Sequence, residues 1–600
     1  MTPMDTLLRR PALCTALLVI AVLAVYGRTL THGFVWDDHQ IIVNNQVLEG
    51  LSTIPRLFLV EDTVEESTGY YRPVTYITFA IERALWGEAP AGYHALNLFL
   101  HTAAVLLFRA VAAALFNNRR LAFVAALVLA LHPVATETVC FLAGGRNTLL
   151  AACFGLLALL GHIRQRPVPA TACFLLAIFS KEFALLFPVI MLLYDIRTRQ
   201  ERPALRVYTS YLACIAGYLA LRSIAVDKAD FISGINLIDL AAAPYLVVRY
   251  LLNLFFPFNL KVLYQTDLTR STVLACSVLL ILLIPVLVTS ARKITGLLFA
   301  YCWLFLFLLP VINIIPLKSM SLMADRYSYF SLMGFALLAG AVTVRLRDRT
   351  LLASLALVCA AYLAVSSWRA GFWKNDLVFF SRMVQDAPDR FCGLKNLGMV
   401  HYRHGDTAAA LRLLAAADNA PDITTRFLIG DAYIYWKENR PDLAENALRR
   451  ACAMNPAYPE PYLVLMMISR QGGQQAAAEE HRQKFQAMAG NADGIMLQRP
   501  YELCRSGETY LERGLYAEAE IYLWQALQFA PDFIPALIDL ASSRYSQGDH
   551  SGAVRYLSRV IALEPAHAAA HHNLMQMYRT LGRTDDAAAE QRRYAEAGGR

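Results

Sequence analysis

The sequence predicts an all-α protein in two parts, a polytopic bundle of membrane-spanning helices followed by a solenoid of helical repeats. Hydrophobic residues make up 57% of the 600-residue chain and charged residues only 17%, which is too apolar for a soluble chain of this size. The apolar residues form successive runs from Ala12 to about Val365. The rest is rich in Ala, Glu, Arg and Gln and repeats every 34 residues. We expect the membrane part at 1–368.

The apolar runs and the basic residues between them predict about eleven spans. A spanning helix needs roughly 17–25 mostly apolar residues, and its cytoplasmic flanks are enriched in Lys and Arg. Arg9 and Arg10 place the N-terminus inside, and an odd number of spans then places the C-terminus outside. The expected spans are 12–26, 94–116, one that ends at His132, 148–162, two short spans within 168–195, 207–226, 271–290, 295–315, 329–344 and 350–368.

Two stretches are exceptions to simple spans. The run 168–195 carries Lys181-Glu182 at its centre, where each charge in one long span would cost about 2.5–3.5 kcal/mol. Two short spans with these charges at an outer turn avoid that cost. Arg249 and Asn253 interrupt 242–258, which we expect to be an amphipathic or re-entrant helix outside. Under this topology the polar clusters all lie on the outer face, where such clusters typically line a functional cavity.

The formal net charge of +8 is explained by basic loops between apolar runs, so we expect membrane lipids and no nucleic acid as partners. The eleven cysteines form no CxxC pair and no His/Cys metal spacing, which disfavours a zinc site or a disulfide framework. The outer loop 28–93 is acidic; its acidic residues include Asp37, Asp38, Glu61, Asp62, Glu65 and Glu66.

The C-terminal part has the signature of tetratricopeptide (TPR) repeats. Turn residues recur every 34 positions in two sets, Gly405, Asn439 and Gly473, then Gly514, Gly548 and Gly582. An Ala follows each turn by five residues, which suits closely packed helix pairs. We expect a linker at 369–388 and about six repeats at 389–600, with an insertion near 490–494. The concave face of such an array commonly holds a peptide or partner; the alternative is a scaffold that only stabilises the enzyme or a dimer.

Ordered motifs in the membrane part resemble the transmembrane and TPR-containing protein O-mannosyltransferases, members of the C-type glycosyltransferase superfamily. The motifs are Phe34-Val35-Trp36-Asp37-Asp38, Tyr71-Arg72-Pro73, His94 with Asn97 and His101, His132-Pro133 with Thr136 and Glu137, Gly145-Arg146, Lys181-Glu182, and Asp325-Arg326-Tyr327 with Tyr329. The resemblance implies transfer of mannose or a similar hexose from a polyprenyl-phosphate-linked donor to Ser/Thr hydroxyls of an exported or lumenal acceptor protein, which the TPR groove is one candidate to hold. We expect a bacterial relative in the inner membrane, with active site and TPR domain facing the periplasm, or the ER lumen in a eukaryote.

Such a transfer requires a base to take the hydroxyl proton and cations to stabilise the departing phosphate. We assign the base to Asp37 or Asp38, favouring Asp37, with the other orienting the acceptor or a metal, and a single displacement would invert the anomeric carbon. Arg326 is the first candidate for the lipid phosphate, because Arg binds phosphate with a bidentate fork. Secondary phosphate candidates are Arg72, Arg146 and Lys181. Tyr327 and Tyr329 are candidates to pack on the sugar or prenyl chain.

Structural alternatives remain open for these residues. Adjacent aspartates in a loop are often solvated or cap a helix, Lys181-Glu182 is equally expected as an interfacial pair, and histidines such as His94 and His132 often face the bundle. Further site candidates are Glu137, Glu182 and Asp325. A divalent cation, Mg or Mn, held by Asp37, Asp38 and Glu137 stays open. The alternative function is a non-enzymatic, membrane-anchored TPR assembly factor for envelope or secretion machinery. A transporter is disfavoured by the long first outer loop.

Overall fold

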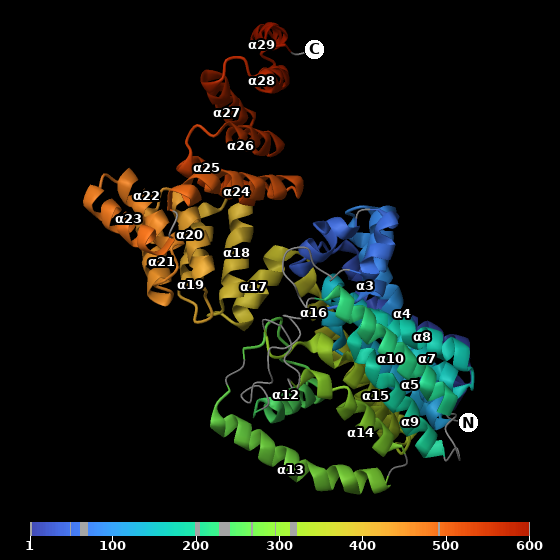
Figure 1. Ribbon diagram of the computed structural model, residues 1–600. Helices are drawn as coiled ribbons and strands as arrows, with labels where there is room; N and C mark the ends of the chain where they lie inside the picture. The colour runs from blue at the N-terminus through green and yellow to red at the C-terminus, as the bar shows by residue number, and fades with distance from the viewer. Residues whose placement is uncertain are drawn as a thin grey trace. The chain divides into compact units, whose positions relative to one another are not determined.

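The computed structural model describes residues 3–48, 50–59, 70–198, 205–226, 241–265, 268–293, 296–312, 321–489 and 492–598. All regular structure in these ranges is helical, which confirms the all-α class. The chain divides into two compact units, Met1–Ala387 and Pro388–Arg600, shown in blue to olive and in yellow to red respectively in Figure 1.

The first unit contains five helical segments long and apolar enough to cross a membrane, at Pro11–Thr31, Pro90–Phe116, Leu142–Ile163, Arg270–Ala291 and Asp348–Trp373. The chain is therefore a membrane protein. Shorter apolar helices accompany these segments at Pro167–Ser180, Ala243–Phe255 and Leu297–Val311. The total of about eleven spans stays a prediction.

The helices of the first unit follow in chain order. They are α1 (Pro3–Leu8), α2 (Pro11–Tyr26), α3 (Pro73–Trp86), α4 (Pro90–Phe116), α5 (Arg119–Leu131), α6 (Ala135–Cys140), α7 (Leu142–Ile163), α8 (Pro167–Ser180), α9 (Phe187–Thr198), α10 (Leu205–Ala225), α12 (Ala243–Phe255), α13 (Arg270–Lys293), α14 (Leu297–Leu306), α15 (Tyr329–Thr343), α16 (Asp348–Ala370) and α17 (Asp376–Asp386). Helix α7 packs between α4 and α8, and α15 packs on α5 and α14, so these helices form the core.

Two breaks in this bundle position polar residues. The run 168–195 is interrupted as predicted, because α8 ends at Ser180 and a short turn, Glu182–Leu186, precedes α9. The corner between α6 and α7 is very tight, since a Cβ on Gly145 would overlap the carbonyl oxygen of Thr138. Only glycine permits this approach. The loop after α2 forms short helical turns up to Phe58, and its acidic residues Glu61, Asp62, Glu65 and Glu66 lie outside the described residues.

The segment 369–388, predicted to be a linker, is ordered and belongs mainly to the first unit. It contains the end of α16, a short turn at Gly371–Trp373 and α17. Asn375 caps α17 by accepting the Val378 N–H at 3.0 Å. Phe379 and Phe380 of α17 are buried. This stretch is therefore part of the packed membrane unit.

The second unit is a stack of antiparallel helix pairs (Figure 1). Its helices are α18 (Phe391–Arg403), α19 (Thr407–Asp418), α20 (Thr425–Lys437), α21 (Pro441–Met454), α22 (Glu460–Gln471), α23 (Gln475–Ala489), α24 (Ala492–Glu512), α25 (Tyr516–Phe529), α26 (Ile534–Ser546), α27 (His550–Leu563), α28 (Ala568–Thr580) and α29 (Thr584–Glu596). All six predicted turn residues have positive φ, from 56° at Asn439 to 82° at Gly548. Ala410, Ala444, Ala519 and Ala553 are fully buried, as close helix packing requires.

Candidate active site

The Asp37-Asp38 pair lies in the loop after α2, and its two carboxylates have different surroundings. Asp38 is completely buried; one carboxylate oxygen accepts the Val35 N–H at 3.1 Å and the other accepts the Ala143 N–H at 2.7 Å. Ala143 is in the first turn of α7, where a negative charge is favourable. Asp38 therefore fastens the loop to the start of α7.

Asp37 is partly exposed, and no other group in the described part of the chain forms a hydrogen bond or ion pair with its carboxylate. Burial raises the pKa of Asp37 to about 6, while the nearby Arg326 charge opposes that rise. Burial raises the pKa of Asp38 to about 7, against the two backbone hydrogen bonds, which lower it. Of the two, only the Asp37 carboxylate is available to a substrate, and its pKa suits a base near neutral pH.

Arg326, whose charge acts on the Asp37 carboxyl, forms an ion pair with Glu137. Arg326 comes from the short turn Asp325–Ser328 before α15, and Glu137 from α6. The Arg326 guanidinium is paired with one Glu137 oxygen, and the Arg326 backbone N–H donates to the other at 3.1 Å. The guanidinium also lies 4.9 Å from the Tyr327 ring centroid and 5.5 Å from that of Phe141. Glu137 thus fixes both the backbone and the side chain of Arg326.

Lys181 is a second cation in this region, and it has no carboxylate partner among the described residues. Its side chain is buried, and the ammonium donates to the Thr148 hydroxyl at 2.7 Å. It lies 4.8 Å from the Phe183 ring centroid and 5.6 Å from that of Tyr327. Glu182 and Glu137 act on this ammonium electrostatically without a direct ion pair, which suits a site that receives an anion.

Arg72 completes a cation cluster of Arg72, Lys181 and Arg326. Lys181 interacts electrostatically with both arginines. Arg72 forms a bidentate pair with Glu182, with Nε at 3.0 Å and a terminal nitrogen at 2.6 Å from the two carboxylate oxygens. Its guanidinium also covers the Tyr70 ring at 4.0 Å. Three motifs that are far apart in sequence therefore converge here.

Arg146, a predicted phosphate candidate, is placed elsewhere in the core. It is fully buried, and its five N–H donors go to Asn97, Thr78, both oxygens of Glu82, and the Tyr93 carbonyl, over 2.5–3.1 Å. All donors of a guanidinium are used by these contacts. Arg146 therefore joins α3, α4 and α7, and no donor is left for a phosphate.

Three other candidates also make structural contacts. His132 donates through Nε2 to the Leu254 carbonyl at 2.9 Å, since its Nδ1 accepts the Val134 N–H. Tyr329 is buried and its hydroxyl meets His101 Nδ1 at 2.8 Å. His94 Nε2 lies 3.3 Å from the Gly33 carbonyl oxygen. These groups join helices, in line with the bundle-facing alternative for the histidines.

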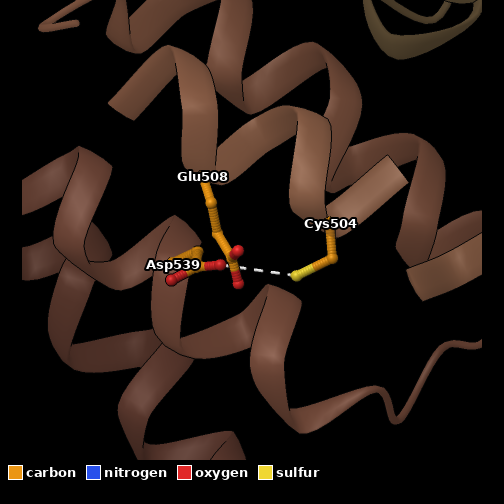
Figure 2. Close-up of side chains that lie close together, drawn as sticks. All are labelled: Cys504, Glu508 and Asp539. Atoms are coloured by element: carbon orange, nitrogen blue, oxygen red, sulfur yellow. Dashed lines mark hydrogen bonds between the residues drawn. The ribbon is translucent and has the colours of Figure 1, made fainter. Parts of the chain in front are cut away.

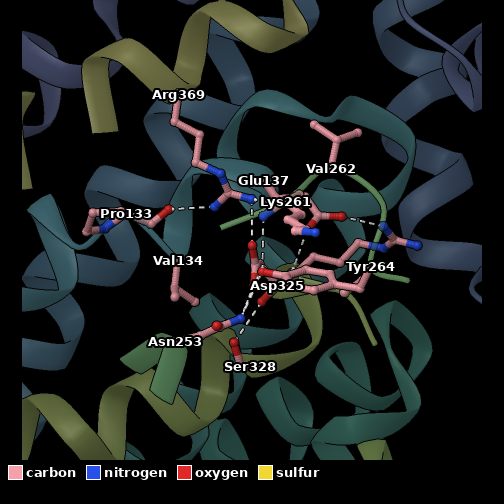
Figure 3. Close-up of polar contacts among 12 residues, drawn as sticks. Pro133, Val134, Glu137, Asn253, Lys261, Val262, Tyr264, Asp325, Ser328 and Arg369 are labelled. Carbon is pink, nitrogen blue, oxygen red and sulfur yellow. Dashed lines mark hydrogen bonds and ion pairs between the residues drawn. The ribbon is translucent and has the colours of Figure 1, made fainter. Parts of the chain in front are cut away.

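Asp325 is the centre of a buried network shown in Figure 3. Its carboxylate accepts from Asn253 at 3.1 Å, from the Tyr264 hydroxyl at 2.8 Å and from Arg369 at 2.5 Å. Arg369 also donates to the Pro133 carbonyl at 2.9 Å. Because Asp325 immediately precedes Arg326, this network fixes the backbone that carries the Arg326 side chain. The sequence reasoning did not identify Arg369, because one arginine at the end of a span looks like a membrane-flanking residue.

The proposed metal-ligand set of Asp37, Asp38 and Glu137 does not converge. Asp38 is occupied by backbone N–H groups and Glu137 by Arg326. Within the described ranges, the one group of three close metal-ligating side chains is Cys504, Glu508 and Asp539 in the second unit (Figure 2). There the Cys504 thiol donates to Asp539 at 3.4 Å, which accounts for the proximity of that pair.

Helix α25 of the fourth TPR repeat covers α18 and α20, the first helices of repeats 1 and 2. Arg403 of α18 pairs with Glu518 at 2.6 Å, and Lys437 of α20 lies 3.6 Å from Glu520. Between these pairs the Trp436 and Trp524 rings meet edge to face, with centroids 5.0 Å apart. The part of the groove expected to hold a peptide is therefore occupied by the chain itself in this structure.

Comparison with known proteins gives relatives that are named protein O-mannosyl-transferases. A tetratricopeptide-repeat family model matches residues 427–458. The protein O-mannosyl-transferase F38B6.6 of Caenorhabditis elegans is 26% identical over 422 residues, which cover 66% of this chain and 61% of that protein. Human protein O-mannosyl-transferase TMTC1 is 38% identical over 165 residues, covering 26% of this chain and 18% of its own length. The chain thus spans less than two thirds of the length of either relative.

Among solved structures, ArnT from Cupriavidus metallidurans bound to undecaprenyl phosphate is 15% identical with a TM-score of 0.41; the match covers 81% of this chain and 80% of that one. The motif resemblance noted in the sequence is confirmed by the sequence comparison: the curated relatives of this chain are protein O-mannosyltransferases with which it shares sequence similarity.

Proposed function

We propose that this chain transfers a hexose, mannose or a close relative, from a polyprenyl-phosphate-linked donor to Ser/Thr hydroxyls of an acceptor protein. The observation that carries the proposal is the Asp37 carboxylate, which has no protein partner in the described ranges and lies next to the paired guanidinium of Arg326. A free base beside a fixed cation is what this reaction requires. The relatives named protein O-mannosyl-transferase support the class of reaction.

The cation cluster provides for the donor phosphate. Arg326 presents a guanidinium whose geometry is fixed by Glu137, and Lys181 supplies a charge that no carboxylate pairs with directly among the described residues. A single-charged phosphate diester would offset the unpaired Lys181 charge and accept further bonds from Arg326. Arg72 is more strongly engaged, since both oxygens of Glu182 hold it. We therefore assign binding of the donor phosphate to Arg326 and Lys181. Arg72 contributes positive charge without contacting the phosphate directly.

The reaction then runs as one displacement. Asp37 accepts the proton of the Ser or Thr hydroxyl, and the hydroxyl oxygen forms a bond to the anomeric carbon of the sugar. The bond from that carbon to the phosphate oxygen breaks, and the polyprenyl phosphate leaves with its negative charge held by Arg326 and Lys181. A single displacement inverts the anomeric configuration. Asp38 holds the loop through Val35 and Ala143 and takes no part in proton transfer.

The membrane location suits a lipid-linked donor. By the basic-loop rule, the motifs that carry the cation cluster lie outside, which is the periplasmic face in a bacterium. In the second unit, repeats 4–6 offer a surface for the acceptor protein, since α25 covers α18 and α20 of repeats 1 and 2. No step of the proposal requires a metal ion.

The test is transfer of labelled hexose from a polyprenyl-phosphate donor to protein in membranes that contain wild type or Asp37→Asn at matched levels. Asp348→Asn serves as the control, because Asp348 is also partly buried and pairs with Arg120 at the start of α5. We expect wild type and control to label protein and Asp37→Asn to lose labelling. Equal labelling by Asp37→Asn, or none by wild type with any hexose donor, would favour a non-enzymatic assembly factor.

A further inference from the structure

A segment outside the predicted motifs holds the loop that carries Asp37. Asp376, the first residue of α17, contacts this loop on both sides of the aspartate pair. One carboxylate oxygen accepts the Trp36 N–H at 3.0 Å, and the other lies 2.9 Å from His39 Nε2. We propose that Asp376 is a positioning residue for the Asp37 carboxylate. The inference rests on the proposed function, since it assigns a role in that reaction.

The backbone at Trp36 explains why such a contact is needed. Trp36 has a φ of +53°, in the left-handed region that bulky residues rarely adopt. This turn sets the direction in which the next residue, Asp37, leaves the loop. The bond from the Trp36 N–H to Asp376 opposes relaxation of the turn toward ordinary φ values. Strain of this kind persists only where surrounding contacts determine the conformation.

The Trp36 ring is held by the same helix. It stacks nearly parallel on Phe141, with centroids 5.8 Å apart and planes 9° apart, and it packs on Phe379 of α17 at 5.7 Å. Phe141 precedes α7, whose first turn binds Asp38. The ring is thus placed between the start of α7 and α17, so a shift of α17 would move both the ring and the backbone of Trp36.

Two further contacts continue the same arrangement along the chain. The Gly33 N–H donates to the Lys374 carbonyl at 2.9 Å, and Arg28 donates to the Ser367 carbonyl at 3.1 Å. Residues 28, 33, 36 and 39 therefore meet residues 367, 374 and 376 in parallel order. Together these contacts form a brace along the loop, and Asp376 is the member nearest to Asp37.

Asp376 binds the backbone and a side chain of the loop, so its effect on the reaction passes through the position of Asp37. A misplaced base lowers the rate of the bound complex, whereas the donor phosphate contacts of Arg326 and Lys181 stay intact. The expected signature is a fall in kcat with little change in the KM for donor. Displacement of a reacting group by about 1 Å costs on the order of 100-fold in rate.

The experiment measures kcat and donor KM for Asp376→Ala, Asp376→Asn and His39→Ala in the full-length protein, with Asp348→Asn as control. Asp348 resembles Asp376: the two side chains are 18% and 16% exposed, and each pairs with a basic group. We expect kcat to fall roughly 10- to 100-fold in Asp376→Ala with the KM changed less than about threefold. Asp376→Asn, which keeps an acceptor for the Trp36 N–H, should recover part of the loss. His39→Ala removes one contact and should give a smaller loss.

Three results would overturn the inference in a preparation whose wild type is active: an unchanged kcat in Asp376→Ala, a change confined to the donor KM, or no advantage of Asn over Ala. If Asp376→Ala does not accumulate in membranes, the test uses Asp376→Asn and His39→Ala instead. A kcat equal to that of wild type in both variants would show that Asp376 does not position Asp37. Failure of the proposed function looks different, because the wild type itself then transfers no hexose.

Discussion

The guanidinium of Arg369 lies 2.5 Å from the carboxylate of Asp325, and neither side chain has more than 1% of its surface exposed. Removing one partner of a buried pair leaves an uncompensated charge, which costs about 3–5 kcal/mol. We expect Arg369→Met to lower the thermal unfolding temperature of the detergent-solubilised protein. The double variant Arg369→Met/Asp325→Asn should be more stable than Arg369→Met alone, because no unpaired charge remains. A double variant less stable than the single one would contradict this account of the pair.

The two adjacent aspartates should respond differently to the same substitution. Asn in place of Asp38 keeps one acceptor oxygen for the two N–H groups of Val35 and Ala143, so one buried bond is lost, at a cost of about 1–3 kcal/mol. Asp37→Asn removes no such bond. We therefore expect Asp38→Asn to lower the unfolding temperature and Asp37→Asn to leave it unchanged while ending transfer. Equal destabilisation by both substitutions would contradict the division of roles.

Lys181→Met should have opposite effects on stability and function. Replacing a buried ammonium that lacks a carboxylate partner in the described ranges is expected to leave the unfolding temperature unchanged or raise it. The same change removes a charge-assisted contact to the donor phosphate, so the donor KM should rise about tenfold. Arg146→Met is the comparison, because it leaves the buried Glu82 unpaired and should mainly destabilise the protein. Lower stability without a change in KM for Lys181→Met would indicate a structural role.

The rate of transfer should depend on pH through Asp37. Burial raises the pKa of this carboxyl from 3.8 to about 6, and the base acts only when deprotonated. At saturating donor, kcat should therefore be highest above about pH 7 and fall about tenfold per pH unit well below pH 6. The Arg326 charge lowers the pKa of Asp37. Arg326→Gln should therefore move the acid limb, the part of the pH profile in which kcat falls as pH decreases, to higher pH. An acid limb near pH 4 would contradict the raised pKa of Asp37.

Part of the site follows from the sequence because its residues lie in motifs next to apolar runs. The basic-loop rule predicts Asp37, Arg72, Lys181 and Arg326 as outer polar groups, and the structure places both arginines within electrostatic range of Lys181. The exclusion of Arg146 was not predictable. It depends on contacts of Arg146 with Glu82 and Asn97, which lie on other helices. The local sequence around Arg146 does not show that these residues lie close to it.

Asp376 and Arg369 were missed for a different physical reason. Hydropathy falls after the last span, so 369–388 was predicted to be a linker, although Asn375 before Asp376-Leu377-Val378 is a helix-capping pattern. The pattern predicts α17 but gives no information about what the helix packs against. The contact of Asp376 with Trp36 joins residues 340 positions apart, and such pairings depend on the tertiary fold.

In the TPR domain, too, the sequence predicts local elements but not the contacts between them. The 34-residue period predicts the turn within each of the six repeats. The insertion near 490–494 breaks this period before repeat 4, whose first helix, α24, begins at Ala492. Its partner α25 then covers α20 through Glu520 and Trp524. Truncating Glu518, Glu520 and Trp524 to Ala should expose α18 and α20, so amide hydrogen exchange in these two helices should quicken while exchange in α28 is unchanged. Exchange that stays slow in α20 would show that α25 does not protect this face; quickening that extends to α28 would indicate unfolding of the array instead of opening of the groove.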